Sequence, residues 1–373
     1  MPDSPLKEII LNEIRTDGPM TVARFMDLAL YHPDLGYYQR VVEIGKKGDF
    51  YTSPHVSALF GQLIGKQLEE MWELMSRPSV FQVVEMGAGH GHMAADILNS
   101  EKCSKEFKAA VSYSIIETSD KLRDQQQELL GEKVSWLESL EALDEQSVTG
   151  CILSNELVDS FPVHKVCMRN GEMSELYLTE ENGELVEQPG QLSDTAIAEY
   201  FGHIELSEGI ETEVNLNALA WMREVSRVLE RGYVITIDYG LAEADYYSSG
   251  RMQGTLRSFH QHQVSGDVFR NPGEQDLTAH VNFTALARAG EKAGLRTEGF
   301  TDQSRFLLGI GEQDIAEALA AFPGAGIEDA KRRVAIRSLF HPQMMGNTFR
   351  VLIQSKGLDS FPISGLKGVR GKI

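Results

Sequence analysis

Short apolar runs alternate with stretches of helical periodicity along much of this chain. Four of the runs end in polar or small residues and are typical of buried strands: Val80–Met86, Val111–Glu117, Cys151–Asn155 and Tyr233–Gly240. Helical spacing appears between them, for example over Met93–Asn99 and Ser119–Leu130. This alternation predicts an α/β fold with a parallel, doubly wound sheet, whose ligands bind at the carboxyl ends of the strands.

The chain ahead of the first strand is predicted to be helical. Ser53 can cap a helix that Pro54 opens at its first position. Apolar residues then recur at spacings of three and four, and the stripe consists of Val56, Leu59, Phe60, Leu63, Ile64, Leu68, Met71, Trp72 and Met75. Such a stripe is typical of a helix face buried in a core, so we do not interpret it as a cofactor site.

Two segments interrupt the alternation of strands and helices. Two Asn-Gly pairs between short alternating runs favour a hairpin or β-meander inserted at about 163–215. Residues 241–282 show little periodicity, and loops of that length are usually lids or binding loops. We therefore predict an N-terminal helical cap (1–78) and a larger domain (79–373) that carries both insertions.

The charge balance narrows the choice of partners. Lys and Arg number 35 and Asp and Glu 55, so the formal net charge of the 373 residues is -20. Such a field repels nucleic-acid phosphates and anionic lipid and tolerates a cationic partner, so we expect no nucleic acid. No apolar run approaches the roughly 20 residues of a membrane span. The N-terminal sequence has neither signal-peptide nor transit-peptide character, which predicts a cytoplasmic protein.

Cysteine and histidine positions do not favour a metal site. The three cysteines are too scattered for a disulfide framework or a metal knuckle, and Cys151 falls in an apolar, strand-like run. His90 and His92 have no third ligand at helical or hairpin spacing, and no carboxylate or cysteine accompanies His260 and His262 in the sequence to complete a metal site. We predict that no metal is required.

The turn after the first strand carries three alternating glycines: Gly87, Gly89 and Gly91. They allow a sharp turn and close approach of a ligand to the backbone. A dinucleotide-binding turn needs its third glycine where His92 stands, and Glu85 would repel a pyrophosphate but attract an ammonium or sulfonium. Glu117 ends the next strand, where a carboxylate can accept both hydrogen bonds of a ribose diol. These features favour S-adenosylmethionine as the cofactor.

A second polar cluster follows the third strand. Asn155 ends the strand, and Glu156 and Asp159 lie three residues apart just after it. Two neighbouring carboxylates without a cation repel each other, which shifts a pKa upward. An exposed acidic turn is the alternative, but the position beside the expected cofactor favours a functional role.

Six motifs stand in order along the chain: GDFYTSP (Gly48–Pro54), VVEMGAGHG (Val83–Gly91), SNELVDSFP (Ser154–Pro162), IDYG (Ile237–Gly240), GTLRSF (Gly254–Phe259) and PGEQDLTAHVNF (Pro272–Phe283). Over about Gly18 to Ser355 the chain resembles the MidA-like family of S-adenosylmethionine-dependent methyltransferases. Mitochondrial members of that family assist assembly of respiratory complex I. The resemblance implies a class I, Rossmann-like, seven-stranded methyltransferase sheet. It also implies methylation of an arginine side chain of a protein, the mitochondrial target being a complex I core subunit.

The resemblance, together with the chemistry above, implies a set of site residues. Cofactor-binding candidates are Thr52, Ser53, Pro54, Glu85, Gly87, Gly89, Gly91, Glu117 and Asn155. Catalytic candidates are Glu156, Asp159 and Asn155, with Glu156 as the first choice for gripping a guanidinium bidentately. Asp238, Tyr239 and His280 are candidates on the substrate side, although Asp238 can equally cap a turn. The sequence departs from the family pattern at His55 and Asn282, where acidic residues are expected.

Three other functions remain open from the sequence. They are a small-molecule methyltransferase, an assembly chaperone that binds the cofactor without turning it over, and a dehydrogenase. Glu85 and His92 argue against the dehydrogenase. A homodimer is possible, but the sequence does not determine the oligomeric state.

Overall fold

A mixed β-sheet forms the centre of the computed structural model, which describes residues 4–40, 57–260, 263–265, 267–322, 324, 326–341, 344–369 and 373. In these residues the sheet has eight strands, and seven of them follow one another in the order β15-β16-β10-β5-β2-β3-β4. Their bounds are β2 Phe81–Met86, β3 Val111–Ile116, β4 Val134–Leu137, β5 Val148–Asn155, β10 Leu229–Leu241, β15 Arg296–Asp302 and β16 Phe349–Lys356. The short strand β14 (Val281–Asn282) pairs with β10.

The strand directions determine where a ligand can bind. Strands β4, β3, β2, β5 and β10 are parallel, whereas β16 pairs antiparallel with both β10 and β15. The chain leaves β2 toward β3 on one side and returns to β5 on the other, so a crevice opens at the carboxyl ends of β2 and β5. This seven-strand path confirms the predicted α/β fold of the class I type.

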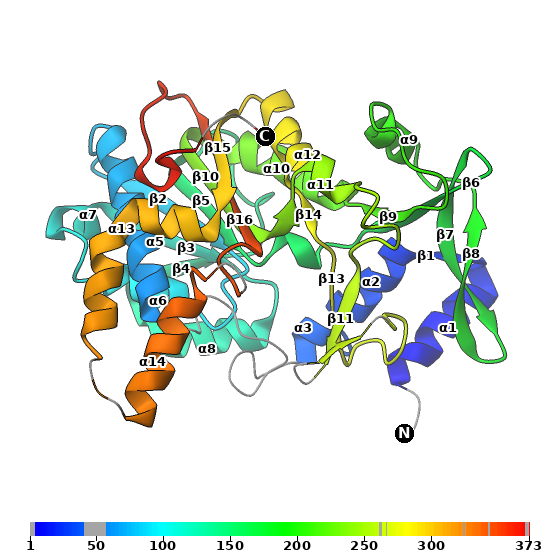
Figure 1. The fold of residues 1–373 in the computed structure, drawn as a ribbon. Helices are drawn as coiled ribbons and strands as arrows, with labels where there is room; N and C mark the ends of the chain where they lie inside the picture. Colours follow the sequence, from blue (N-terminus) through cyan, green and yellow to red (C-terminus); the bar gives the residue numbers. More distant parts are fainter. Residues whose placement is uncertain are drawn as a thin grey trace.

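Helices cover both faces of this sheet (Figure 1). On one face lie α5 Ala58–Leu74, α6 His92–Leu98, α7 Lys105–Ala110, α13 Gln303–Ala320 and α14 Ile327–Ser338, and on the other lie α10 Leu216–Val228 and α12 Phe283–Lys292. Successive strand residues alternate between the two cores, as Val83 and Val84 do. Burial on both faces explains why these strands read as continuous apolar runs. Helix α8 (Asp120–Leu130) follows β3.

The predicted apolar stripe is confirmed as core. All of its described members, from Leu59 to Met75, are buried in the layer between α5 and the sheet. Helix α5 begins at Ala58 and is capped by Ser57, whose side chain accepts the Leu59 N–H. The predicted cap Ser53 and the predicted first residue Pro54 lie outside the described residues. The predicted domain bounds stay a prediction, and the contacts of α5 favour placing it with the sheet domain.

A second, smaller sheet stands beside the main one (Figure 1). It consists of β1 Met20–Thr21, β6 His164–Arg169, β7 Glu172–Glu181, β8 Glu184–Gly190 and β9 Glu211–Val214. Asn170-Gly171 and Asn182-Gly183 all have positive φ and form the turns of the two hairpins, as the Asn-Gly pairs predict. Helices α1 (Pro5–Asp17) and α2 (Val22–Tyr31) pack on this sheet, and α9 (Thr195–Phe201) shares a separate apolar cluster with β6 and β9.

Residues 241–282 contain more structure than the expected long loop. Helix α11 (Glu243–Tyr246) is followed by a small sheet of β11 Arg257–His260, β12 Gln263–Ser265 and β13 Asp276–Thr278. These strands are too short to give a periodic signal. They are held in part by Glu213 of β9, which is 1% exposed and accepts the backbone N–H of Thr255 and Leu256. The expectation of a long irregular loop is therefore wrong for the described part of this segment, whereas its role as a lid or binding segment stays a prediction.

Candidate active site

A pocket of about 800 Å³ opens at the carboxyl ends of β2, β3 and β5. The turns after these strands line one side. Side chains of α2, of α3 (Tyr37–Arg40) and of residues 255–280 line the opposite side. The pocket is therefore shared between the main sheet and elements outside it. Its size suits a cofactor together with one substrate side chain.

The glycine turn after β2 has the geometry that the sequence predicts. Gly87, Gly89 and Gly91 all have positive φ, at 68°, 53° and 78°. A Cβ on Gly87 would lie 2.9 Å from Leu157 Cδ1, so a side chain there would require Leu157 to shift, and the positive φ disfavours it in any case. Gly87 and Gly89 line the pocket, whereas Gly91 begins α6 and faces Leu130 of α8.

Glu85 lines the pocket with a buried side chain. It is 1% exposed, and Tyr113 donates its hydroxyl to Glu85 Oε2 at 2.6 Å. Burial raises the pKa of Glu85 to about 7, the Tyr113 hydrogen bond partly opposes this, and the nearby Glu117 adds to it. A cationic ligand would offset the cost of ionising this buried carboxyl group.

We expect Glu85→Gln to stabilise the cofactor-free protein at pH 8. Since the pKa is higher in the folded state, the stability linked to Glu85 is present below its ordinary pKa of 4.5 and is lost as the pH rises through about 7. The variant should gain up to about 3 kcal/mol in unfolding free energy at pH 8 and little at pH 4.5. Urea unfolding at the two pH values measures this, and equal gains at both would contradict it.

Glu117 is held by a polar network at the end of β3. Its Oε1 accepts the Ser119 N–H at 2.9 Å, and its Oε2 accepts from Gln126 Nε2 at 3.1 Å. Gln126 also donates to the carbonyl of Gly89 and accepts from the indole of Trp136. Burial raises the pKa of Glu117. One network therefore fixes both the glycine turn and the expected ribose ligand.

Glu156 and Asn155 line the pocket at the end of β5. Glu156 has φ 54°, a left-handed conformation that is strained for a residue with a long side chain. Asn155 donates its Nδ2 to Glu156 Oε1 at 3.1 Å. The Oδ1 of Asn155 is buried without a hydrogen-bond partner in the described structure. The adjacent amide acceptor and carboxylate form a site for N–H donors.

Asp159 and Asp238 have different positions. Asp159 lines the pocket and is 5% exposed, and its pKa is raised well above the ordinary value by burial and then by Asp238, Asp276 and Glu156. Asp238 is fully buried and does not line the pocket. Its Oδ2 accepts the backbone N–H of Leu157, Val158 and Asp159, so it supports the turn η2 (Val158–Ser160). This geometry gives Asp238 the turn-capping role rather than contact with substrate.

The other two substrate-side candidates do reach the pocket. Tyr239 lines it, and its ring packs on Phe349 with centroids 4.0 Å apart. His280 also lines it, and its Nδ1 is buried without a hydrogen-bond partner among the described residues. Burial, with Arg251 and Arg257 nearby, lowers the pKa of His280 to about 4, so its imidazole is neutral at pH 7.

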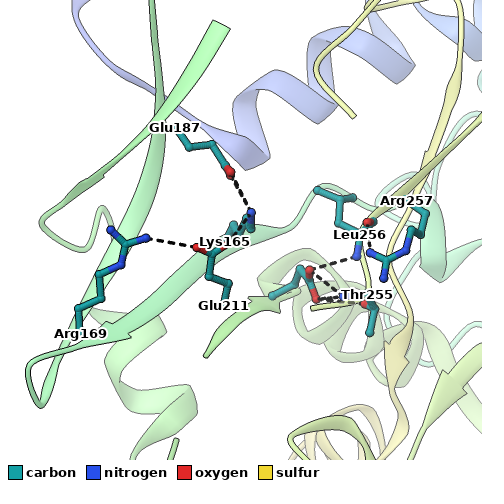
Figure 2. A network of polar contacts seen from close by, with 8 residues as sticks. Lys165, Arg169, Glu187, Glu211, Thr255, Leu256 and Arg257 are labelled. Carbon is teal, nitrogen blue, oxygen red and sulfur yellow. Dashed lines mark hydrogen bonds and ion pairs between the residues drawn. The ribbon is translucent and has the colours of Figure 1, made fainter. Parts of the chain in front are cut away.

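The sequence did not predict that residues outside the main sheet form the pocket wall opposite the glycine turn. This wall includes Tyr31, Tyr38, Arg257 and Asp276. Figure 2 draws Thr255, Leu256 and Arg257 together with the ion pairs of Lys165 with Glu187 and Glu211. The two groups are linked through β9, which carries both Glu211 and the acceptor of the Thr255 and Leu256 N–H groups. Asp276 could have been found from the sequence, because it lies in the motif PGEQDLTAHVNF. Tyr31 and Tyr38 lie in the segment YHPDLGYY, whose only notable feature is its tyrosine content.

Several predicted positions stay untested or lie elsewhere. Thr52, Ser53, Pro54 and His55 are outside the described residues. Asn282 caps α12 by accepting the Ala285 N–H and donates to the Tyr200 hydroxyl, away from the main pocket. In the described part of the chain, no group of three or more potential ligands could hold a metal ion. No helix there is long and apolar enough to cross a membrane.

The arrangement suits S-adenosylmethionine in three respects. The glycine turn leaves room for backbone contact, Glu117 is held at the pocket lining just after β3, and a positive charge would favour ionisation of the buried Glu85. When bound, this cofactor supplies an electrophilic methyl group on a sulfonium.

Comparisons with known proteins agree with this geometry. Residues 63–301 match the family model described as putative S-adenosyl-L-methionine-dependent methyltransferase. A mouse relative, "Protein arginine methyltransferase NDUFAF7, mitochondrial", is 32% identical over 93% of this chain and 83% of its own. A Drosophila melanogaster homologue of the same name is 29% identical over 95% of this chain and 86% of its own.

A solved structure is similar over nearly the whole chain. It is a likely methyltransferase of the COG1565 superfamily from Burkholderia thailandensis, bound to S-adenosyl-homocysteine. It covers 97% of this chain and 94% of its own, with 30% identity and a TM-score of 0.85.

One expectation is overturned by these relatives. The N-terminal sequence predicts a cytoplasmic protein, but the relatives from fly, mouse and human are named as mitochondrial proteins. The prediction of a cytoplasmic location is therefore wrong. Its basis was the absence of a recognisable targeting signal, which is a weak argument because it uses only the composition of a few residues.

Proposed function

Because this chain belongs to the family of S-adenosyl-L-methionine-dependent methyltransferases, we propose that it methylates an arginine side chain of a protein. The observation that carries the proposal is the acidic lining of the pocket. Its carboxylic acids are Asp27, Glu85, Glu117, Glu138, Glu141, Glu156, Asp159, Glu224 and Asp276. Arg257 is the one Lys or Arg side chain among the described lining residues. Such a pocket attracts a cationic substrate.

The reaction sets two tasks for the protein. Methyl transfer from a sulfonium is an in-line displacement, so catalysis depends mainly on alignment and exclusion of water. A guanidinium is a poor nucleophile because its charge is delocalised and it stays protonated in proteins. One N–H proton must leave as the new C–N bond forms, and the product remains a cation. A carboxylate at the reacting nitrogen favours both formation of the C–N bond and loss of the proton.

Glu156 is our first choice for that carboxylate. It follows the last residue of β5, Asn155, whose Nδ2 donates to Glu156 Oε1 and whose own Oδ1 is left to accept an N–H of the substrate. The left-handed backbone of Glu156 is a strained feature of the kind found at functional sites. Asp159, in the turn η2 that follows, is the second choice. Asp238 holds the backbone of this turn and thereby fixes the position of Asp159 at the pocket.

The direct test is methyl transfer into protein. The purified enzyme would be incubated with S-adenosylmethionine labelled in the methyl group and with a lysate, and the labelled product would be resolved by size and hydrolysed. We expect label in a protein band and recovery as methylarginine. A respiratory complex I core subunit is our candidate acceptor. Label only in small molecules would favour a small-molecule methyltransferase, and cofactor binding without transfer would favour the chaperone.

Glu117→Ala should weaken cofactor binding without unfolding the protein. Loss of hydrogen bonds from the ribose hydroxyls to a carboxylate should cost roughly 1.5–3 kcal/mol of binding free energy. Calorimetric titration with S-adenosylhomocysteine measures this. Glu138→Ala, which removes a carboxylate from the same pocket lining at a different loop, is the control for general electrostatics. Equal losses in the two variants would show that Glu117 is not a specific ribose ligand.

A further inference from the structure

One face of the small sheet of β11 and β13 forms much of the pocket wall opposite the glycine turn. Its alternate residues all line the pocket: Thr255, Arg257 and Phe259 from the β11 side, and Asp276, Thr278 and His280 from the β13 side. Side chains two residues apart along a strand point to the same face. We propose that Arg257 and His280 on this face, together with the charge of Arg251, form a subsite that binds a carboxylate.

Two groups can supply that carboxylate. One is an acidic side chain of the protein acceptor near the methylated arginine, and the other is the methionine end of the cofactor. Arg257 lies on the wall opposite the glycine turn, which favours the acceptor. The assignment to an acceptor rests on the proposed function, and it adds that the acceptor carries an acidic residue near its arginine. The subsite itself does not depend on the reaction.

Arg257 has N–H donors available to an anion. Its side chain is exposed, and it makes one hydrogen bond to the described residues, from Nη1 to the carbonyl of Leu256 at 2.6 Å (Figure 2). None of the described carboxylic acids that line the pocket forms an ion pair with it. A guanidinium has five N–H donors, so Arg257 keeps enough of them for a bidentate contact with a carboxylate.

The backbone on both sides of the subsite is held in place. Glu213, which is buried in β9, accepts the N–H groups of Thr255 and Leu256. Thr255 Oγ1 accepts the N–H of His280 at 3.0 Å, which joins the segments that carry Arg257 and His280. A guanidinium on a fixed backbone loses less conformational freedom when it binds an anion than one on a mobile loop does.

The surroundings of His280 are positively charged, although the pocket as a whole is acidic. Burial and then the charges of Arg251 and Arg257 lower the pKa of His280 to about 4, so both guanidinium groups lie near its imidazole. His280 Nδ1 is also buried without a hydrogen-bond partner in the described structure. Like charges that lie close together repel, and a carboxylate bound beside them would reduce that repulsion. This part of the lining therefore attracts an anion, whereas the rest of the described lining repels one.

Propionate, which carries the carboxylate of a glutamate side chain, tests the subsite. The full-length protein, labelled with ¹³C at histidine Cε1, would be titrated with propionate at pH 7 and constant ionic strength, both free of cofactor and saturated with S-adenosylhomocysteine. Loss of one signal in His280→Gln identifies the signal of His280. We expect propionate to shift this signal to saturation in both states, and neutral propionamide at the same concentrations to leave it in place.

A pair of matched variants assigns the binding to Arg257. Arg257→Gln should lower propionate affinity by about tenfold or more, as for loss of hydrogen bonds to a charged group. Arg270→Gln makes the same change at an exposed position outside the pocket lining and should leave the affinity unchanged. An unchanged midpoint of urea unfolding shows that each variant is folded. Equal propionate affinity in Arg257→Gln and the wild type, or no binding of propionate in either state, would overturn the proposal.

The two states of the protein distinguish the two sources of the carboxylate. Binding to the protein saturated with S-adenosylhomocysteine supports a subsite for an acidic side chain of the acceptor. Binding only to the cofactor-free protein supports the carboxylate of the cofactor, and Arg257→Gln should then weaken S-adenosylhomocysteine binding.

The same measurements separate this inference from the proposed function, because propionate binding is followed without methyl transfer. If propionate binds through Arg257 but no methylarginine forms in any protein, the proposed function fails and the subsite stands. If methylarginine forms but propionate does not bind, the subsite fails and the proposed function stands.

Discussion

Replacing Glu156 by glutamine should lower the turnover number by on the order of 10² or more while cofactor affinity changes little. Glutamine keeps the shape of the side chain and can still hydrogen bond, but it removes the charge that polarises the guanidinium and assists loss of its proton. Because this interaction strengthens as charge develops in the transition state, the loss should fall on turnover rather than on binding. The measurement is the initial rate of methyl transfer to the identified protein substrate.

Asp159→Asn is the matched comparison for Glu156. Both residues line the same pocket, but Asp159 lies in the following turn and is buried among other carboxyl groups. If Asp159 only orients Glu156, we expect Asp159→Asn to lower the turnover number less than Glu156→Gln does. Near-normal methylation by Glu156→Gln would contradict the catalytic assignment. A loss confined to S-adenosylmethionine affinity would make Glu156 a cofactor residue instead.

Asp238→Ala should destabilise the fold by roughly 3 kcal/mol, because it leaves buried backbone N–H groups without an acceptor. Asp238 Oδ2 accepts from Leu157, Val158 and Asp159, and Oδ1 accepts from Tyr239 at 2.8 Å. These amides lie at the junction of β5, β10 and η2, where Val158, Asp159 and Asp238 are buried. The loss should appear as a lower midpoint of urea unfolding.

Asp194→Ala is the control for this stability effect. Asp194 caps α9 by accepting one N–H, that of Ala196, at an exposed position. Its removal should cost about 1 kcal/mol, as for an ordinary helix cap. If Asp238→Ala costs no more than Asp194→Ala, the turn η2 does not depend on the buried carboxylate. In that case the turn-capping role of Asp238 would be contradicted.

The two acidic candidates on neighbouring strands show the limit of reading a site from motifs. Glu156 follows β5 and Asp238 lies near the end of β10, and the sequence left open whether Asp238 contacts substrate or caps a turn. In the structure, Glu156 lines the pocket, whereas Asp238 points its carboxylate at the backbone N–H groups of the next turn. Only the relative position of β5 and β10, which pair from Leu229 to Ile237, decides between them.

The sequence by itself determined the features that depend on neighbours along the chain. Strands buried on both faces, the apolar stripe of α5, the Asn-Gly hairpins and the glycine turn follow from local periodicity and backbone conformation. The place of Glu85 beside that turn likewise needs only its position in the motif, whereas its raised pKa depends on burial and on Tyr113 and Glu117. Each of these predictions concerns residues within one element or one turn of each other.

The tertiary structure alone decided which distant elements complete the pocket. Tyr38 and Asp276 are 238 residues apart, and Glu213 holds a segment 42 residues further on. Periodicity indicates which face of an element is buried, but it does not indicate which surface covers that face. That choice depends on how all the packed surfaces fit together, so the wall opposite the glycine turn could be found only in the folded molecule.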